Sequence, residues 1–293
     1  MTPTFLTTSA LGKKRRRKDS IFKGICAVAA LTAVSILVVL IAKVIMDGIG
    51  RVSPQFITSM PSQMFPSKAG ILGPLVGSLL VMVLTILFVV PVGVAAAIYL
   101  EEFTPKKNAF IRFIQVNISN LAGVPSIVFG MLGLAVFVTM MGLGKSVLTG
   151  ALTMSILVLP MVILVTQEAL KAVPQAYREA SLALGTTQWQ TIRRAVLPSA
   201  LPGILTGIIL AASRAIGETA PLIVVGAVGY LNFVPAKLED KYTVLPLQIL
   251  DWIGQPRQDF RTGAAAAILV LMAMLLILNS AAIIIRARAQ KKV

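Results

Sequence analysis

The chain has 293 residues, of which 57% are hydrophobic and only 13% are charged. Because a soluble domain is about half apolar and about a quarter charged, this composition and a mean hydropathy of +0.88 indicate an integral membrane protein with one membrane domain. The chain has no histidine and a single cysteine, Cys26. These counts exclude disulfide frameworks, Cys/His metal sites and histidine-dependent nucleophiles, and we expect no catalytic residue, bound metal or cofactor.

The net charge of +16 comes from 27 Lys and Arg residues against 11 Asp and Glu residues. In a soluble protein this balance would indicate nucleic-acid binding, but here the basic residues gather beside apolar segments. A basic run at 13–18 precedes the first such segment, and four more basic residues lie within 286–292. Under the positive-inside rule both termini are cytoplasmic, and the N-terminal tail is a topology signal near membrane lipid rather than a nucleic-acid site.

Apolar runs predict six membrane spans, at 24–46, 71–100, 110–141, 146–169, 199–226 and 263–285. An even number places both termini on one side, where 18 of the 27 Lys and Arg residues then lie, against eight on the other side. The predicted fold is therefore all-α, in the plasma membrane. Its parts are a basic tail at 1–20, a first, uncleaved transmembrane helix at 21–46, an external loop at 47–70, a five-helix core at 71–285 that contains a cytoplasmic loop at 171–198, and a basic tail at 286–293.

Proline and glycine interrupt several predicted spans, at 91–93, 123–125, 160 and 217–221. Proline breaks the hydrogen-bond ladder of a helix, and non-helical backbone is tolerated at membrane depth where it lines a cavity. We therefore expect the third to fifth helices to be broken and to line a path. The external loop at 227–262 has two interpretations: a docking surface for an external partner, or an interfacial cap with Tyr242 and Trp252 at the level of the lipid headgroups.

The 171–198 segment is the longest predicted cytoplasmic loop, and it has helical periodicity. We expect one helix that ends at a glycine cap, Gly185, and a second helical stretch that starts at Trp189 and stops at 197–198. The first helix presents a small-residue face that the groove of another protein can accept. That face consists of Ala180, Ala183 and Leu184, with Arg178 and Glu179 at its rim.

One arginine, Arg214, falls inside the fifth predicted span, close to its middle. Charge at that depth costs about 2.5–3.5 kcal/mol, so a function or a partner is expected. Glu218 lies four residues later on the same helix face and can neutralise the guanidinium, and Gly217 allows close approach of another backbone. Ser213 and Thr219 add hydroxyl groups. The arginine fork matches two oxygens of a tetrahedral anion, whereas the alternative is an ion pair that fixes this span against a neighbour.

Hydrolysis of ATP by the chain itself would need the phosphate-binding loop G-x-x-x-x-G-K-[ST]. The nearest match, at 142–146, lacks the leading glycine because position 139 is Thr139. A proton-driven carrier usually has several intramembrane carboxylates, whereas Glu218 is the one convincing candidate in this sequence. The chain is therefore expected to be a transport subunit and not an enzyme.

Three segments carry a resemblance to a known family. The tripeptide at 179–181 (EAS), Gly185 after three intervening residues and the dipeptide at 197–198 (LP) resemble the EAA-x3-G-x9-I-x-LP loop of importer permeases in the ATP-binding-cassette (ABC) family. Ser181 stands in place of the second alanine, and Ala195 in place of isoleucine. The segments 213–222 (SRAIGETAPL) and 121–130 (LAGVPSIVFG) are similar to motifs of PstA-type permease subunits of phosphate importers, and the resemblance covers about residues 70–285.

The resemblance implies a permease subunit with six transmembrane helices and type I ABC importer architecture, in the inner membrane of a bacterium. It also implies a homologous PstC-type permease, an ATPase subunit dimer, an external phosphate-binding protein, and inorganic phosphate as substrate. The residues placed on the substrate pathway are Arg214, Glu218, Thr219, Ser213 and Ser126, and those placed at the ATPase contact are Arg178, Glu179, Ala180, Ser181 and Gly185. Three alternatives stay open: another tetrahedral oxyanion such as sulfate or molybdate, an ATP-independent channel or anion carrier, and a structural membrane anchor.

Overall fold

The computed structural model describes residues 10–104 and 109–290, and the regular elements of these residues are all helical. The all-α prediction is confirmed for this part of the chain. The α-helices are α1 (Ala10–Gly48), α2 (Pro54–Thr58), α3 (Leu72–Ile98), α4 (Ala109–Leu121), α5 (Ser126–Gly133), α6 (Val147–Lys171), α7 (Gln175–Ala183), α8 (Gln188–Thr191), α9 (Leu197–Gly217), α10 (Ala220–Val224), α11 (Leu245–Ile253) and α12 (Gln258–Gln290). Three π-helical turns extend or join them: η3 (Tyr99–Phe103), η4 (Leu134–Met140) and η5 (Ile192–Val196). Residues 1–9, 105–108 and 291–293, which belong to the two predicted tails and to the predicted loop after the second span, lie outside the described residues.

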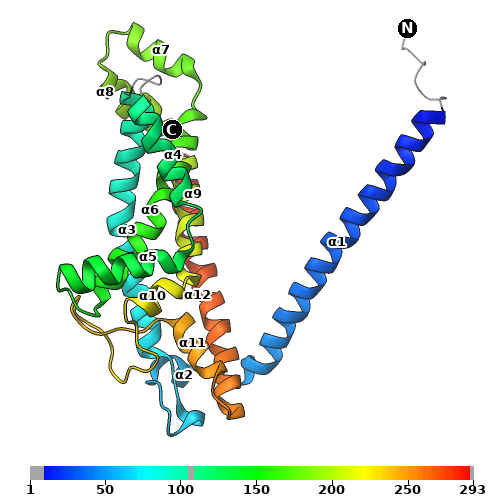
Figure 1. Ribbon diagram of the computed structural model, residues 1–293, viewed down its shortest axis with the longest axis vertical. Helices are drawn as coiled ribbons and strands as arrows, with labels where there is room; N and C mark the ends of the chain where they lie inside the picture. The colour runs from blue at the N-terminus through cyan, green and yellow to red at the C-terminus, as the bar shows by residue number, and fades with distance from the viewer. Residues whose placement is uncertain (1–9, 105–108, 291–293) are drawn as a thin grey trace.

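Six apolar segments match the six predicted spans. Within the described residues, five helices are long and apolar enough to cross a membrane, and a bent helix pair provides the sixth segment. Most of these helices run along the long axis of the molecule (Figure 1). The start of α1 and the end of α12 lie at the same end of this axis as α7 and α8, and α2 and α11 lie at the opposite end (Figure 1).

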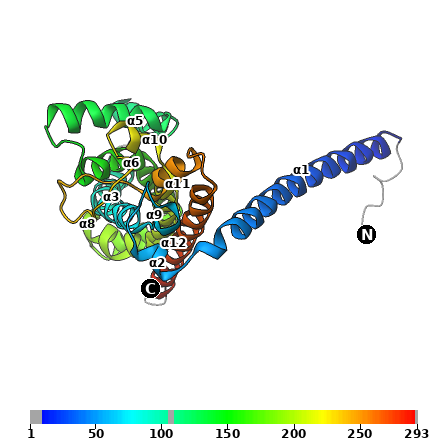
Figure 2. The ribbon, with the colours of Figure 1, turned by 90° about the horizontal axis from the view of Figure 1, so that it is seen from below.

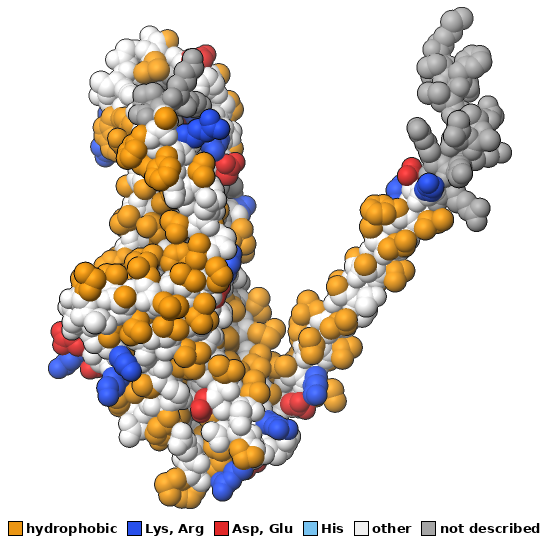
Figure 3. Space-filling view, viewed as in Figure 1, with side chains coloured by type: hydrophobic (Ala, Val, Ile, Leu, Met, Phe, Trp, Pro, Cys, Tyr) orange, Lys and Arg blue, Asp and Glu red, His pale blue; other side chains and the backbone are white. Residues whose placement is uncertain are grey.

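The first helix, α1, extends away from the other helices. α1 includes the basic run at 13–18, and it meets α12 near Gly48, where an added Cβ would lie 2.6 Å from the carbonyl carbon of Ala265. Away from this crossing, α1 extends far from the other helices (Figure 2) and exposes apolar side chains along its length (Figure 3). Such a helix needs lipid or another protein around it, because a large apolar surface is unfavourable in water.

The third predicted span is not one straight helix. α4 and α5 are bent by 105° at the short break between them, and α5 lies across the bundle (Figure 1). Pro125, at the start of α5, has an extended ψ of 135°. Because a proline also pushes the residue before it out of the helical region, the backbone turns at this point. The predicted break at 123–125 is confirmed.

Two other predicted breaks are wrong. Pro91 lies inside α3 and Pro160 lies inside α6, and both helices continue through these prolines. The reason is mutual support: α3 and α6 pack along each other, and neighbouring helices tolerate a proline inside an apolar bundle. The predicted stop at 197–198 is also wrong, because η5 joins α8 to α9 and places Pro198 in the first turn of α9, where a missing N–H is tolerated.

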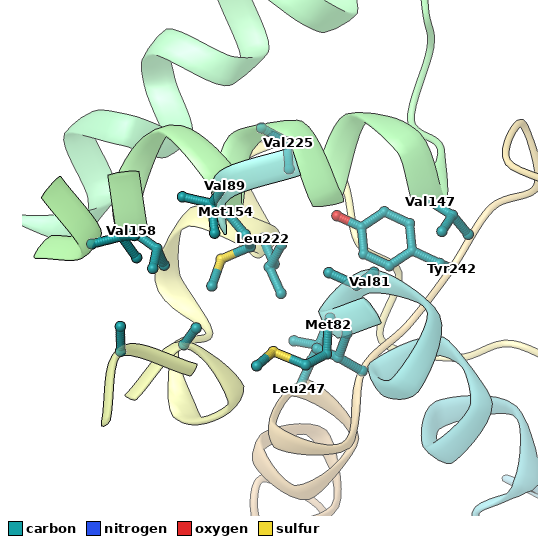
Figure 4. Close-up of a cluster of buried hydrophobic side chains, with 14 residues drawn as sticks. Val81, Met82, Val89, Val147, Met154, Val158, Leu222, Val225, Tyr242 and Leu247 are labelled. Atoms are coloured by element: carbon teal, nitrogen blue, oxygen red, sulfur yellow. The ribbon is translucent and has the colours of Figure 1, made fainter. Parts of the chain in front are cut away.

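The largest apolar core lies where α3, α6 and α10 meet the segment that precedes α11 (Figure 4). Met82 of α3, Met154 of α6 and Leu222 of α10 point into this cluster together with Tyr242. This cluster packs the segment between α9 and α10 against α3 and α6. Packing, as well as Pro221, therefore sets the position of the break between α9 and α10.

The two aromatic residues predicted at headgroup level are buried instead. Tyr242 is 0% exposed and packs on Gly150 of α6, where a larger residue would collide with its ring. Trp252 is 2% exposed and lies between Phe56 and Phe260, at centroid distances of 6.2 and 6.4 Å. Side chains buried in the protein do not contact lipid headgroups, so the interpretation of these two residues as an interfacial cap is wrong: Tyr242 packs against α6, and Trp252 packs α11 against α2 and α12.

Candidate functional site

The fifth predicted span breaks directly after the arginine. α9 ends at Gly217, three residues after Arg214, and Glu218 has an extended backbone with ψ 121°. A short helix, α10, then begins at Ala220 with Pro221 in its first turn. Pro221 cannot donate a hydrogen bond to a carbonyl of the preceding turn, and here, unlike at Pro91 and Pro160, the helix ends. Arg214 therefore lies in the last turn of a helix and not in the middle of a straight span.

Arg214 and Glu218 form the predicted ion pair, but Glu218 lies beyond the end of α9 and not on the same helix face as predicted. Nε of Arg214 lies 3.7 Å from Oε1 of Glu218, and the two side chains are 64% and 22% exposed. An ion pair this long and this open contributes only about 0–1 kcal/mol. The negative end of the α9 dipole also favours a cation at this position. The guanidinium is thus only weakly paired, and it can exchange its partner for an incoming anion.

Ser126, Arg214 and Glu218 line one cavity of about 550 Å³. The cavity lies between the bend of α4 and α5, the middle of α6 and the end of α9. Apolar side chains, among them Phe129 and Met161, form much of its wall. A concave and mostly apolar site with a few converging polar groups is typical of a small-ligand site. Here the polar groups are a cation, a carboxylate and a hydroxyl, which suit a small anion.

Two predicted pathway residues lie elsewhere. The Oγ of Ser213 is 2.8 Å from the carbonyl oxygen of Ile209 and 2.6 Å from Oδ1 of Asn279, so it faces α12. Thr219 precedes α10 and is not part of the cavity wall. Gly217 differs from its prediction as well, because nothing in the described chain lies within 4 Å of a Cβ added there. The structure thus brings together three of the five predicted pathway residues.

A close contact between α5 and α10 supports the cavity. A Cβ added to Gly130 would lie 2.7 Å from Cα and 2.9 Å from the carbonyl oxygen of Pro221. Only glycine allows the two backbones to approach this closely. Gly130 is the last residue of the 121–130 motif, so the sequence pointed to this glycine. The sequence did not show that Pro221 is its contact. Gly130 therefore positions the segment that carries Glu218.

A second candidate site is the helix α7, which projects from one end of the molecule (Figure 1). None of its residues is buried, and Leu184, directly after it, is 85% exposed. Gly185 has φ +80°, a conformation that favours glycine, so it ends this helix as predicted. Glu179 and Ala180 are also exposed. α7 therefore offers an open face for another protein to cover.

Two residues predicted at the ATPase contact point inward. The Oγ of Ser181 is 2.9 Å from Oγ1 of Thr186 and 3.1 Å from Oγ1 of Thr191, so it ties α7 to α8. Arg178 binds Glu102 at the end of α3, and its predicted place at the rim of the docking face is therefore wrong. The sequence analysis did not select Glu102. The available signal was an acidic pair at 101–102, at the inner end of a predicted span where basic residues dominate.

Several known proteins are similar to the chain over most of its length. The family described as "Binding-protein-dependent transport system inner membrane component" matches residues 89–292. The probable ABC transporter permease protein YqgI of Bacillus subtilis is 37% identical over 209 residues, which cover 71% of this chain and 70% of that protein. The phosphate transport system permease protein PstA of Mycobacterium leprae is 36% identical over 216 residues, which cover 73% of this chain and 70% of that protein.

A solved structure shares the fold. One chain of a bacterial ABC transporter involved in the import of the acidic polysaccharide alginate superimposes with a TM-score of 0.64 at 17% sequence identity. The match covers 96% of this chain and 99% of that chain. At this identity the likeness shows the fold alone, which is that of a type I ABC importer permease. The predicted architecture is confirmed.

Proposed function

The chain belongs to the family of inner membrane components of binding-protein-dependent transport systems, and we propose that it is the permease subunit through which an ATP-driven importer moves inorganic phosphate into a bacterial cell. As a multi-pass inner membrane permease of this family, it works with an ATPase and a substrate-binding protein, so ATP is hydrolysed in another subunit. We propose further that the ATPase is a dimer, that a PstC-type permease is the second membrane subunit, and that both termini face the cytoplasm.

The cavity around Arg214 is the observation that carries the proposal. An arginine donates two parallel hydrogen bonds to two oxygens of one anion, and a phosphate presents such oxygens on every face. Ser126 adds a hydroxyl donor to the same cavity. Relatives named as phosphate permeases are similar over most of the chain, which supports phosphate over another oxyanion. Ser213 stays outside the proposed pathway, because it binds Asn279.

Glu218 has a proposed role at each stage of transport. Before phosphate arrives, Glu218 pairs with Arg214 at 3.7 Å and neutralises it. Phosphate oxygens then replace the carboxylate as partners of the guanidinium. The carboxylate left nearby repels the bound anion, and this repulsion limits trapping, since a site that only attracts cannot release. Closure of the ATPase moves α7 and opens the cavity to the two sides of the membrane in turn.

Uptake of labelled phosphate tests the proposal. Vesicles that contain the chain with its co-purified partners are assayed with and without internal ATP, and with excess sulfate. We expect ATP-dependent uptake that sulfate does not reduce. Uptake without ATP would replace the importer by an anion carrier, and ATP-dependent uptake that sulfate blocks would replace phosphate by another oxyanion.

The Glu179→Lys variant tests the docking role of α7. We expect the phosphate taken up per ATP hydrolysed to fall by at least about fivefold, because the reversed charge disturbs the contact that couples the two sites. Uptake and ATP hydrolysis are measured on the same vesicles. The matched control is Asp19→Lys, the same charge change at an exposed residue near the start of α1. An unchanged ratio in Glu179→Lys would contradict the role of Glu179.

A further inference from the structure

α7 is attached to the membrane helices without a packed core of its own. None of its nine residues is buried. A groove of about 720 Å³ is lined by α7, α8 and the adjacent ends of α3 and α6. Residues 172–174 connect α7 directly to α6, and the side-chain hydrogen bonds of α7 add to this connection.

Arg178 makes most of these bonds. Its Nη2 lies 2.6 Å from Oε1 of Glu102, and its Nε lies 3.2 Å from Oε2 of the same carboxylate. Nη1 donates to the carbonyl oxygen of Val173 and Nη2 to that of Leu170, both at 2.9 Å. One side chain of α7 is thus bound to the end of α3 and to the end of α6. A lysine could not make these bonds together, because only the guanidinium has a planar fork of five donors.

The backbone of Glu102 also accepts a hydrogen bond from α8. The Nε2 of Gln188, the first residue of α8, donates to the carbonyl oxygen of Glu102. The side chains of Arg178 and Glu102 are only 16% and 9% exposed. Separating a shielded ion pair leaves each charge without its partner, which is energetically costly, so the two side chains stay together. The end of α3 is therefore bound to both α7 and α8.

We propose that Arg178 and Glu102 form a rigid joint that carries the movement of α7 to α3 and α6. Arg178 contacts the end of α6, and Met161 of the same helix lines the Arg214 cavity. A displacement of α7 therefore reaches the cavity wall through a continuous helix. Arg178 is a positioning residue in this proposal, because it touches neither the cavity nor the open face of α7. The inference rests on the proposed function for the choice of phosphate as the transported ion and for the docking of the ATPase on α7.

A double-mutant cycle tests the joint. Arg178→Gln, Glu102→Gln and the double variant are prepared in the assembled complex, and phosphate uptake per ATP hydrolysed is measured for each. We expect each single variant to lower this ratio by at least about fivefold, and the double variant to be no lower than the singles, because residues in one ion pair are not additive. The control is Lys23→Gln, which removes a positive charge from an exposed residue of α1 and should leave the ratio unchanged.

A distance measurement tests the joint without any transported ion. In a Cys26→Ser background, spin labels are attached at Tyr99→Cys near the end of α3 and at Gln175→Cys in α7. With Arg178 present we expect one narrow distance distribution that ATP binding does not change, and in Arg178→Gln a broader one. If phosphate were the wrong substrate, uptake would fail in every variant while this measurement would still report on the joint. Additive losses in the cycle, or equal distributions with and without Arg178, would overturn the proposal.

Discussion

The Arg214→Gln variant is expected to lose phosphate uptake by at least about 100-fold while the complex still assembles. The arginine offers two charge-assisted hydrogen bonds to the anion, each worth about 1.5–3 kcal/mol, so their loss lowers affinity by about two orders of magnitude or more. The fold should not suffer, because the Arg214 side chain is 64% exposed and its pairing with Glu218 is loose. Uptake of labelled phosphate is measured beside the yield of assembled complex.

Two further variants separate anion binding from packing. Arg214→Lys keeps the charge but loses the planar fork, so we expect uptake between those of the wild type and Arg214→Gln. Arg112→Gln removes an exposed arginine near the start of α4, away from the cavity, and should leave uptake unchanged. If Arg214→Gln and Glu218→Gln both prevented assembly, the pair would be a packing ion pair, and the anion site would have to be placed elsewhere.

The Gly130→Ala variant is expected to lose most phosphate uptake although Gly130 itself does not line the cavity. Its new Cβ would lie 2.7 Å from Cα and 2.9 Å from the carbonyl oxygen of Pro221, and backbone cannot move aside as a flexible side chain can. Overpacking of this kind costs about 1–3 kcal/mol. The strain is relieved when α10 moves away from α5, and this movement also displaces Glu218, three residues before Pro221. Thermal stability of the purified complex and phosphate uptake are measured together.

A glycine in open space is the matched control for this variant. Nothing lies within 4 Å of a Cβ added to Gly50, so Gly50→Ala should change neither stability nor uptake. Wild-type uptake in Gly130→Ala would show that α10 tolerates the displacement. In that case the contact between α5 and α10 would not position Glu218.

The sequence by itself determined the features that depend on composition or on neighbours a few residues apart. Six apolar segments follow from hydropathy, because the bilayer core sets the length of a span. The end of α7 at Gly185 and the pairing of Arg214 with Glu218 follow from local spacing. Proline marked the candidate breaks at 123–125 and at 217–221, but the same signal at Pro91 and Pro160 gives no break, so the sequence alone does not determine which prolines end a helix.

Only the tertiary structure decided which distant residues meet. Arg178 and Glu102 are 76 residues apart, and Ser213 and Asn279 are 66 residues apart. Each pairing depends on how two helices are rotated about their axes, and an apolar sequence with few polar residues leaves this rotation undetermined. The same reason applies to the 105° bend, whose presence proline predicts but whose direction is set by the helices around α5. Contacts between segments distant in sequence, and not local propensity, thus place Arg214, Glu218 and Ser126 around one cavity.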